Sequence, residues 1–379
     1  MNVRRQRGFT LIELMIALVV SSLLVGLILA IFSRMSLAYR GQQQIAGVQQ
    51  VLAAARATIE SDAKQTGFAV AQGFKIARTG LNVQWPLQIK DSSTGPDQVA
   101  FFYADSSAQA VVGSVLAPWS STATVVTVDP PTGFAANDLV VFSKVDTTIN
   151  SKFPGQAGIA ANIATYDACV GKIATISGSN LVILTTPPWG IAGSPQCGPN
   201  GPAAGAAIYK FVARGYRIDP NPGTSARAAQ GALQQSPTGG LFNSAAQDEW
   251  TDVAYGFTDI QTALQVYDGD AIDTDLDGDP AREWYSGATQ NDTSVPITAA
   301  SPTPLQMSIS LVARTDRDVE GVTTDKTPDL TAAPNLDNNP VGNRVSVALP
   351  SATNDALKGS RIYRYLTFKV DFRNMGIGY

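Results

Sequence analysis

The sequence predicts an α+β fold in which one long N-terminal helix packs on an antiparallel β-sheet, with an inserted β-rich subdomain. One observation is a helical pattern near the N-terminus, with no proline before Pro86. Another is the pattern after Gly67, where short apolar runs alternate with Gly, Pro, Asn and Asp, as is typical of strands and turns. Composition agrees: 15% of the 379 residues are charged, and 33 glycines and 22 prolines indicate a loop-rich chain.

The first element is an apolar segment long enough to cross a bilayer. From Leu14 to Phe32 the chain has no charged residue, and Ser21, Ser22 and Gly26 are its only non-apolar residues. At about 1.5 Å per residue, a helix of this length spans the hydrocarbon core. The sequence therefore predicts a transmembrane helix over residues 9–32.

The edges of this segment do not fit an ordinary signal peptide or anchor. Three arginines, Arg4, Arg5 and Arg7, precede it, and Glu13 lies just inside it. A signal peptide carries its cleavage site after the apolar region. A charge within a bilayer costs roughly 2.5 to 3.5 kcal/mol on insertion scales, so a simple anchor has no reason to keep Glu13. The arginines predict that residues 1–8 stay in the cytoplasm and the rest of the chain lies outside.

The segment Gly8-Phe9-Thr10-Leu11-Ile12-Glu13-Leu14 resembles the class III signal of type IV pilins and type II secretion pseudopilins. This resemblance implies that a membrane-embedded prepilin peptidase cuts after Gly8, releasing the leader 1–8, and methylates Phe9. It also implies that the apolar segment is kept as the packing core of a filament. Glu13 is then expected to pair with the N-terminal ammonium of a neighbouring subunit, the partner that an intramembrane carboxylate needs.

The helical pattern continues beyond the membrane segment over residues 33–66. Apolar residues recur there at spacings of three and four, between Gln, Arg and Asp. They are Ile45, Val48, Val51, Leu52, Ala55, Ile59 and Ala63. We therefore expect one helix from about Phe9 to Lys64 that ends at Gly67 and packs its apolar stripe on the globular domain.

After the helix we expect a β-rich pilin domain, formed by residues 67–120 and 206–379, with an inserted β subdomain over residues 121–205. The stretch 224–246 is rich in Ala, Gln, Ser and Gly and predicts a linker or surface loop. The expected strands are 99–103, 125–128, 139–142, 172–176, 181–184, 208–218, 254–257, 260–267, 305–313 and 363–372.

Three segments of the second half, 206–211, 259–267 and 363–374, resemble the PilW-like minor pilins. In that family a strand ending near a tyrosine leads into an Asp-Gly-rich loop, and the chain ends on a strand with an Arg-Asn pair. This resemblance is weakest over the predicted insert.

The chain contains no histidine, which excludes Ser-His-Asp and Cys-His catalysis and histidine-based metal sites. Its two cysteines, Cys169 and Cys197, lie on the predicted external side and are expected to form a disulfide. Such a bridge stabilises a fold by roughly 3 to 4 kcal/mol in the loop-entropy treatment. The alternative, a reactive thiol pair, lacks both an activating histidine and Cys-x-x-Cys spacing.

An acidic loop is the candidate chemical site, with Ca²⁺ as the candidate cofactor. Three alternating aspartates followed by Gly278 match the first half of a calcium-binding loop. Two features depart from that pattern: Trp284 stands where the bidentate acid belongs, and Pro280 interrupts the loop. A solvated turn between strands is the alternative. The candidate ligands are Asp268, Asp270, Asp273, Asp275, Asp277, Asp279 and Glu283.

The resemblance implies a non-enzymatic structural subunit: a minor pilin that promotes assembly of a type IV pilus near its tip, and so twitching motility and adhesion. A minor pseudopilin of a type II secretion system is the alternative. A membrane-anchored periplasmic enzyme is a third hypothesis, but the sequence contains no nucleophile–base pair to support it. Glu13 argues against the outermost tip position, because the tip-most pseudopilins usually lack this residue. The globular domain is also bulky for a subunit repeated along a filament.

The expected partners are the prepilin peptidase, other minor and major pilins, the inner-membrane assembly platform and a tip adhesin. The net charge of −4 and the absence of a basic patch predict no direct nucleic-acid binding. The expected location is the inner membrane, as a single-pass protein with a cytoplasmic N-terminus. After assembly, the protein is expected in the periplasm and the extracellular pilus.

Overall fold

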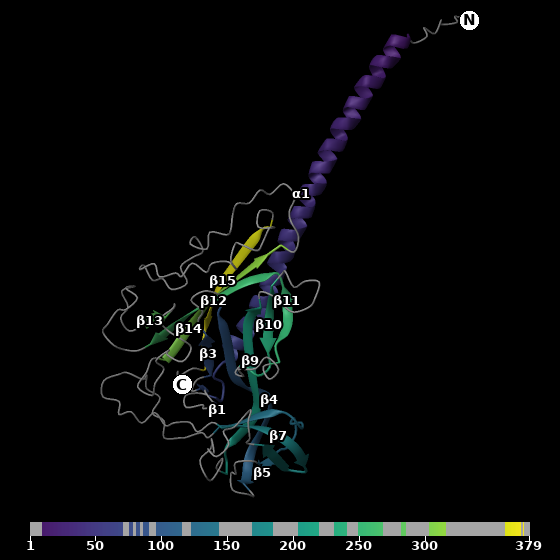
Figure 1. Ribbon diagram of the computed structural model, residues 1–379. Coiled ribbons are helices and arrows are strands. Elements are labelled where there is room, and N and C mark those ends of the chain that lie inside the picture. Colours follow the sequence, from purple (N-terminus) through teal and green to yellow (C-terminus); the bar gives the residue numbers. More distant parts are fainter. Residues whose placement is uncertain are drawn as a thin grey trace, which may run out of the picture.

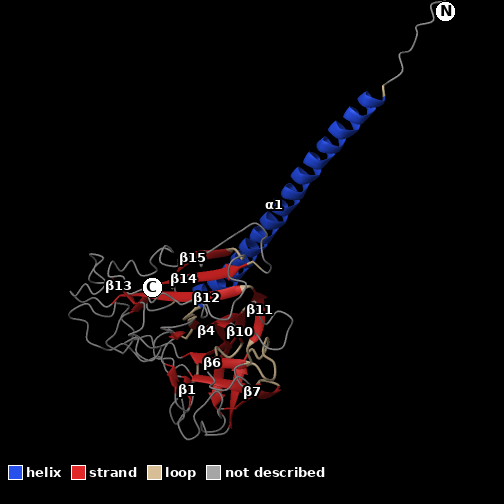
Figure 2. Cartoon of the chain, turned by 45° about the horizontal axis from the view of Figure 1, so that its top comes forward, coloured by secondary structure: helices blue, strands red, loops and turns tan. Residues whose placement is uncertain are grey.

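The computed structural model confirms the α+β fold class, with one long helix and antiparallel strands (Figure 1, Figure 2). It describes residues 10–70, 76–78, 81–83, 86–90, 96–115, 123–143, 169–184, 204–219, 231–240, 249–267, 282–285, 303–315, 361–372 and 374.

Helix α1, Leu11–Gln65, is continuous over 55 residues and therefore about 82 Å long. It ends where Thr66 leaves the helical conformation and Gly67 adopts a φ of 84°, which glycine reaches without steric cost. The Gly67 N–H then donates to the Phe102 carbonyl (3.0 Å), joining the helix end to the sheet. The predicted helix and its stop at Gly67 are thus reproduced to within two residues.

The two halves of α1 have different surroundings. Its N-terminal half projects away from the globular region, while its C-terminal half lies against the strands (Figure 1). All the buried residues of the helix fall in that second half, beginning at Gly41 and following the predicted stripe. They are Gly41, Val48, Leu52, Ala55, Ile59, Asp62 and Ala63.

A four-stranded antiparallel sheet, in the order β13-β12-β14-β15 within the described residues, covers one side of the packed half. Its strands are β12 (Phe257–Tyr267), β13 (Arg282–Tyr285), β14 (Thr303–Arg314) and β15 (Tyr363–Asp371). One face supplies Leu264, Ile309 and Phe368 to the core that also contains Leu52 and Ile59 of the helix.

A second antiparallel sheet of nine strands, in the order β11-β10-β9-β6-β7-β8-β5-β4-β3, is formed among the described residues. Its members are β3 (Leu87–Lys90), β4 (Gln98–Val115), β5 (Ala123–Asp129), β6 (Leu139–Ser143), β7 (Cys169–Ser177), β8 (Asn180–Leu184), β9 (Ala207–Asp219), β10 (Ala232–Ser236) and β11 (Thr251–Tyr255). A short separate pair consists of β1 (Ile76–Arg78) and β2 (Leu81–Val83).

Part of the nine-stranded sheet closes into a barrel, because β4 and β9 also pair with each other. The ring runs β4-β5-β8-β7-β6-β9 and returns to β4. Its interior is filled by fully buried apolar side chains, including Val126, Phe142, Ile173 and Ile183, so it is a packed core and not a channel. The barrel lies at the end of the globular region farthest from the N-terminus of α1 (Figure 1).

Strands β5 to β8 lie within the predicted insert 121–205, but their barrel is completed by the outer ends of β4 and β9. The strand predicted over 99–103 is much longer, since β4 runs from Gln98 to Val115. The prediction of a linker over 224–246 is wrong at β10, which is a buried strand. Its Gln234 and Ser236 look like loop residues in sequence, yet their side chains are hydrogen-bonded inside the sheet.

Candidate assembly helix and its attachment to the sheet

The first turn of α1 holds Glu13 in a capping box. The backbone N–H and the hydroxyl of Thr10 both donate to Glu13 Oε2, each at 3.0 Å. The Glu13 N–H donates in turn to Thr10 Oγ1 (3.3 Å). These bonds satisfy backbone donors that have no partner within the helix, and they place the carboxylate at the positive end of the helix dipole. Gly8 and Phe9 lie outside the described residues.

The N-terminal half of α1 presents apolar side chains on every side. Large apolar residues from Leu11 to Met35, and Tyr39, have at least half of their surface exposed, while Leu37 is partly covered. The helix is long and apolar enough to cross a membrane. The described residues bury none of its most apolar part. This exposure is consistent with anchoring in a membrane, because an apolar surface of this size requires lipid or protein cover.

The C-terminal half is attached to the sheet through Asp62, a carboxylate on the buried side of the helix. Tyr103 Oη, from β4, donates to Asp62 Oδ1 (2.7 Å), and Tyr216 Oη, from β9, donates to Asp62 Oδ2. Gln235 Nε2, from β10, donates to Tyr216 Oη (2.7 Å). We call Asp62, Tyr103 and Tyr216 the tyrosine clamp.

Burial is the main cause that raises the pKa of Tyr103 and of Tyr216 far above the ordinary tyrosine value, and the Asp62 charge adds to it. Both hydroxyls therefore stay protonated at neutral pH and act as donors to the carboxylate. Each carboxylate oxygen has a partner, so the buried charge of Asp62 is hydrogen-bonded on both sides.

A second attachment lies at the last turn of α1. Asn374 Nδ2, in the segment after β15, donates to the carbonyls of Lys64 (3.3 Å) and Gln65 (3.5 Å). Thr66 Oγ1 donates to the Asp62 carbonyl (3.1 Å). Helix carbonyls that lack partners within the helix are thus satisfied by its own C-cap residue, Thr66, and by Asn374 from the segment after β15.

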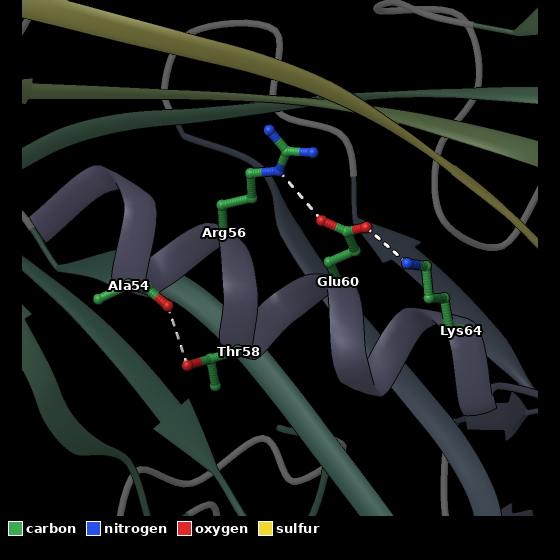
Figure 3. Close-up of polar contacts among 5 residues, drawn as sticks. All are labelled: Ala54, Arg56, Thr58, Glu60 and Lys64. Atoms are coloured by element: carbon green, nitrogen blue, oxygen red, sulfur yellow. Dashed lines mark hydrogen bonds and ion pairs between the residues drawn. The ribbon is translucent and has the colours of Figure 1, made fainter. Parts of the chain in front are cut away.

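On the side that faces β15, the packed half carries the charged row Arg56, Glu60 and Lys64 (Figure 3). Glu60 pairs with Lys64 (2.6 Å) and Arg56 (3.0 Å), and Arg56 also lies over the Phe368 ring of β15, 5.5 Å from its centre. The hydrogen bonds from Lys64 and then Arg56 lower the pKa of Glu60. Because both cations are about half exposed, these pairs contribute little to stability.

The predicted metal and disulfide residues fall largely outside the described residues. The aspartates from Asp268 to Asp279 belong to the segment 268–281, which joins β12 to β13 where Tyr267 pairs with Arg282. Glu283 lies on β13 opposite Val266, and only its backbone is described. Within the described parts of the chain, no group of three metal-binding side chains occurs.

The structure describes only one of the two cysteines, and only in part. Cys169 begins β7, with only its backbone described, and Cys197 lies outside the described residues. The disulfide therefore stays a prediction.

Sequence reasoning did not single out Thr10 or the tyrosine clamp, and it noted Asn374 only in the Arg-Asn pair of the PilW-like resemblance. Thr10 had a readable signal, since Thr-x-x-Glu before an apolar run is a capping box. Asp62 also had one, because it falls between Ile59 and Ala63 on the apolar stripe of the helix. The two tyrosines had no such signal, and nothing in the sequence indicated that Asn374 contacts the helix, because only folding brings these residues to it.

Residues 3–29 match the family described as the prokaryotic N-terminal methylation motif. The match includes the segment from Gly8 to Leu14 and the exposed helix as far as Leu29, so the chain carries a prepilin-type N-terminal signal.

Among solved structures, a type IV-like pilin from Thermus thermophilus is similar to this chain. The likeness covers 86% of this chain and 97% of that one, at 11% identity and a TM-score of 0.32. A TM-score this low does not assign the globular region to the pilin fold. No curated protein matches the chain.

Proposed function

We propose that this protein is a minor pilin of a type IV pilus, a structural subunit that acts near the tip to promote pilus assembly, twitching motility and adhesion. The observation that carries the proposal is the prepilin-type signal joined to one continuous helix. The first half of that helix is exposed and apolar, and the second half is attached to a β-sheet. This arrangement leaves an apolar rod free for other helices or lipid, and a globular region to one side.

In this proposal the prepilin peptidase removes residues 1–8 and methylates Phe9 while the chain is anchored in the inner membrane. Other minor pilins, the major pilin and the assembly platform are its partners, and a tip adhesin docks on it. Glu13 leaves its capping box with Thr10 to pair with the ammonium of a neighbouring subunit.

Deletion of the gene, with and without complementation, tests the role. We expect the deletion to abolish surface pili and twitching while leaving the secretion of folded exoproteins unchanged. Surface pili are counted by electron microscopy and exoproteins are measured in the culture medium. The reverse result, loss of secretion with normal twitching, identifies a pseudopilin of a type II secretion system instead.

The acidic loop is proposed as a Ca²⁺ site of the globular region, supported by its alternating aspartates and Gly278. Calorimetric titration of the detergent-solubilised chain with CaCl₂ measures it directly. We expect binding heat that Asp275→Ala removes; no heat at millimolar calcium in the parent protein would end this proposal.

A further inference from the structure

Five exposed residues lie on several sides of α1 where the apolar run ends, with the partly covered Ser36 and Leu37 between them. Phe32, Arg34, Met35, Tyr39 and Arg40 are these five residues, which we call the collar. Phe32, Met35 and Tyr39 expose 71%, 66% and 62% of their surface, and both arginines are exposed. Because α1 is helical throughout, their spacing along and around the axis is fixed.

The collar lies at the depth where a bilayer changes from hydrocarbon to headgroups. The uncharged run Leu14–Phe32 covers about 28 Å of helix, close to the ~30 Å hydrocarbon thickness. Arg34 and Arg40 follow directly and lie about 9 Å apart along the axis. The headgroup layer adds about 5 to 7 Å on each side of the hydrocarbon, so Arg34 lies within it. Arg40 begins about 12 Å beyond Phe32 and reaches back to this layer with its long side chain, which tilts toward the N-terminus of the helix.

The two collar arginines differ from the third arginine of the helix. Arg56 is paired with Glu60 and lies over Phe368. No acidic residue occurs on the helix between Glu13 and Glu60, and the described residues form no ion pair with Arg34 or Arg40. Each presents a guanidinium fork that suits the oxygens of a phosphate.

The arrangement around the helix favours lipid over a protein partner. Arg34 and Arg40 are six positions apart and therefore point about 120° from each other around the axis. One flat protein surface cannot face both, whereas headgroups surround a membrane-spanning helix. Tyrosine and phenylalanine beside the arginines also fit the interface, where aromatic rings and long cationic side chains gather.

We propose that the collar binds anionic phospholipid headgroups of the leaflet that faces the globular region. This inference rests on the membrane anchoring in the proposed function. It gives the subunit a defined depth in the bilayer before assembly, with Arg34 and Arg40 each contacting lipid phosphates.

The test measures lipid selectivity of the processed chain, starting at Phe9, so that the leader arginines do not contribute on the other face. The chain is reconstituted in phosphatidylcholine bilayers with spin-labelled phosphatidylglycerol or spin-labelled phosphatidylcholine. Electron paramagnetic resonance gives the relative association constant of the two lipids with the protein. We expect a preference for phosphatidylglycerol that falls about fivefold for each of Arg34→Gln and Arg40→Gln.

Arg56→Gln is the matched control and should leave the preference unchanged, and high salt should weaken the preference of the parent chain. Circular dichroism of each variant checks that α1 is intact. An unchanged preference in the Arg34→Gln/Arg40→Gln protein overturns the proposal. So does an unchanged preference combined with weaker binding to other pilin subunits, since that result assigns the collar to a protein partner.

The proposed function fails separately from the collar. Normal pili and twitching in the deletion strain would refute the pilus role without changing the lipid selectivity. A chain that sodium carbonate strips from membranes would refute the anchoring and the collar together.

Discussion

The two halves of α1 share one unbroken backbone and have opposite surroundings. The first half is exposed from Leu11 to Met35 within the described structure, and Thr10 caps its first turn. The second half is held by apolar packing, by the tyrosine clamp and by Asn374. Changes in the first half should therefore affect assembly, and changes in the second half should affect folding stability.

Glu13 should give the largest effect, and the choice of substitution separates its charge from its cap. Glutamine can replace glutamate in a capping box but carries no charge. We expect Glu13→Gln and Glu13→Ala each to lower incorporation into filaments about tenfold or more, with no change in the melting temperature of the globular region. Immunoblots of sheared pili measure incorporation.

Thr10→Ala is the companion variant, since it removes the cap and leaves the charge. It should assemble far better than Glu13→Gln. If Glu13→Gln assembles normally and Thr10→Ala does not, the cap and not the charge is what assembly requires.

The second largest effect should come from Asp62. Asp62→Ala leaves two buried tyrosine hydroxyls without their acceptor, and we expect it to lower the free energy of unfolding by about 3 to 5 kcal/mol. Urea unfolding of the detergent-solubilised chain, followed by tryptophan fluorescence, measures the change.

Glu60→Gln, in the same turn but outside the clamp, is the matched control and should cost less than about 1 kcal/mol, because its cationic partners are about half exposed. In a protein that already carries Tyr103→Phe and Tyr216→Phe, Asp62→Ala should cost a different amount, because the three residues act together. Strict additivity would mean that the clamp is not an energetic unit.

The clamp should also make the packed half sensitive to alkali. Tyr103 and Tyr216 have a raised pKa in the folded protein, so unfolded tyrosine ionises first as the pH rises. The stability that depends on their protonated form is complete below about pH 10 and is lost above it, by about 1.4 kcal/mol per pH unit for each tyrosine.

Urea unfolding at several pH values from 9 to 11 measures this loss. Tyr216→Phe should reduce the loss of unfolding free energy per pH unit by the contribution of one tyrosine. A parent chain whose stability is flat over this range would contradict the buried, protonated state of both hydroxyls.

The smallest effect should come from Asn374. Asn374→Ala removes donors to the last carbonyls of α1 and should cost about 1 kcal/mol in unfolding free energy. Asn374→Asp should cost more than alanine, because it places a negative charge at the negative end of the helix. If the aspartate variant is the more stable of the two, Asn374 does not cap the helix.

Local features of the fold were readable from the sequence, and features made by distant residues were not. The helix and its end at Gly67 follow from periodicity and from the conformational freedom of glycine. Closure of the barrel depends on the pairing of β6 with β9 and of β4 with β5, and alternation of apolar residues does not specify partners.

The same division holds for the candidate site. The capping box of Thr10 and Glu13 spans three positions and could have been recognised. The bonds of Asp62 span 41 positions to Tyr103 and 154 positions to Tyr216. No local pattern reports a contact over such a separation, and Gln234 shows the related error of taking a buried polar strand for a loop.

The unbroken helix also determines where a mechanical load enters the globular region. A tension applied at the N-terminal end of α1 passes along its backbone hydrogen bonds to the turn at Thr66 and Gly67. There the tyrosine clamp joins the helix to β4 and β9, and Asn374 joins it to the segment after β15. The pull is thus divided between both sheets at one end of the helix, and it reaches the barrel only through β4 and β9.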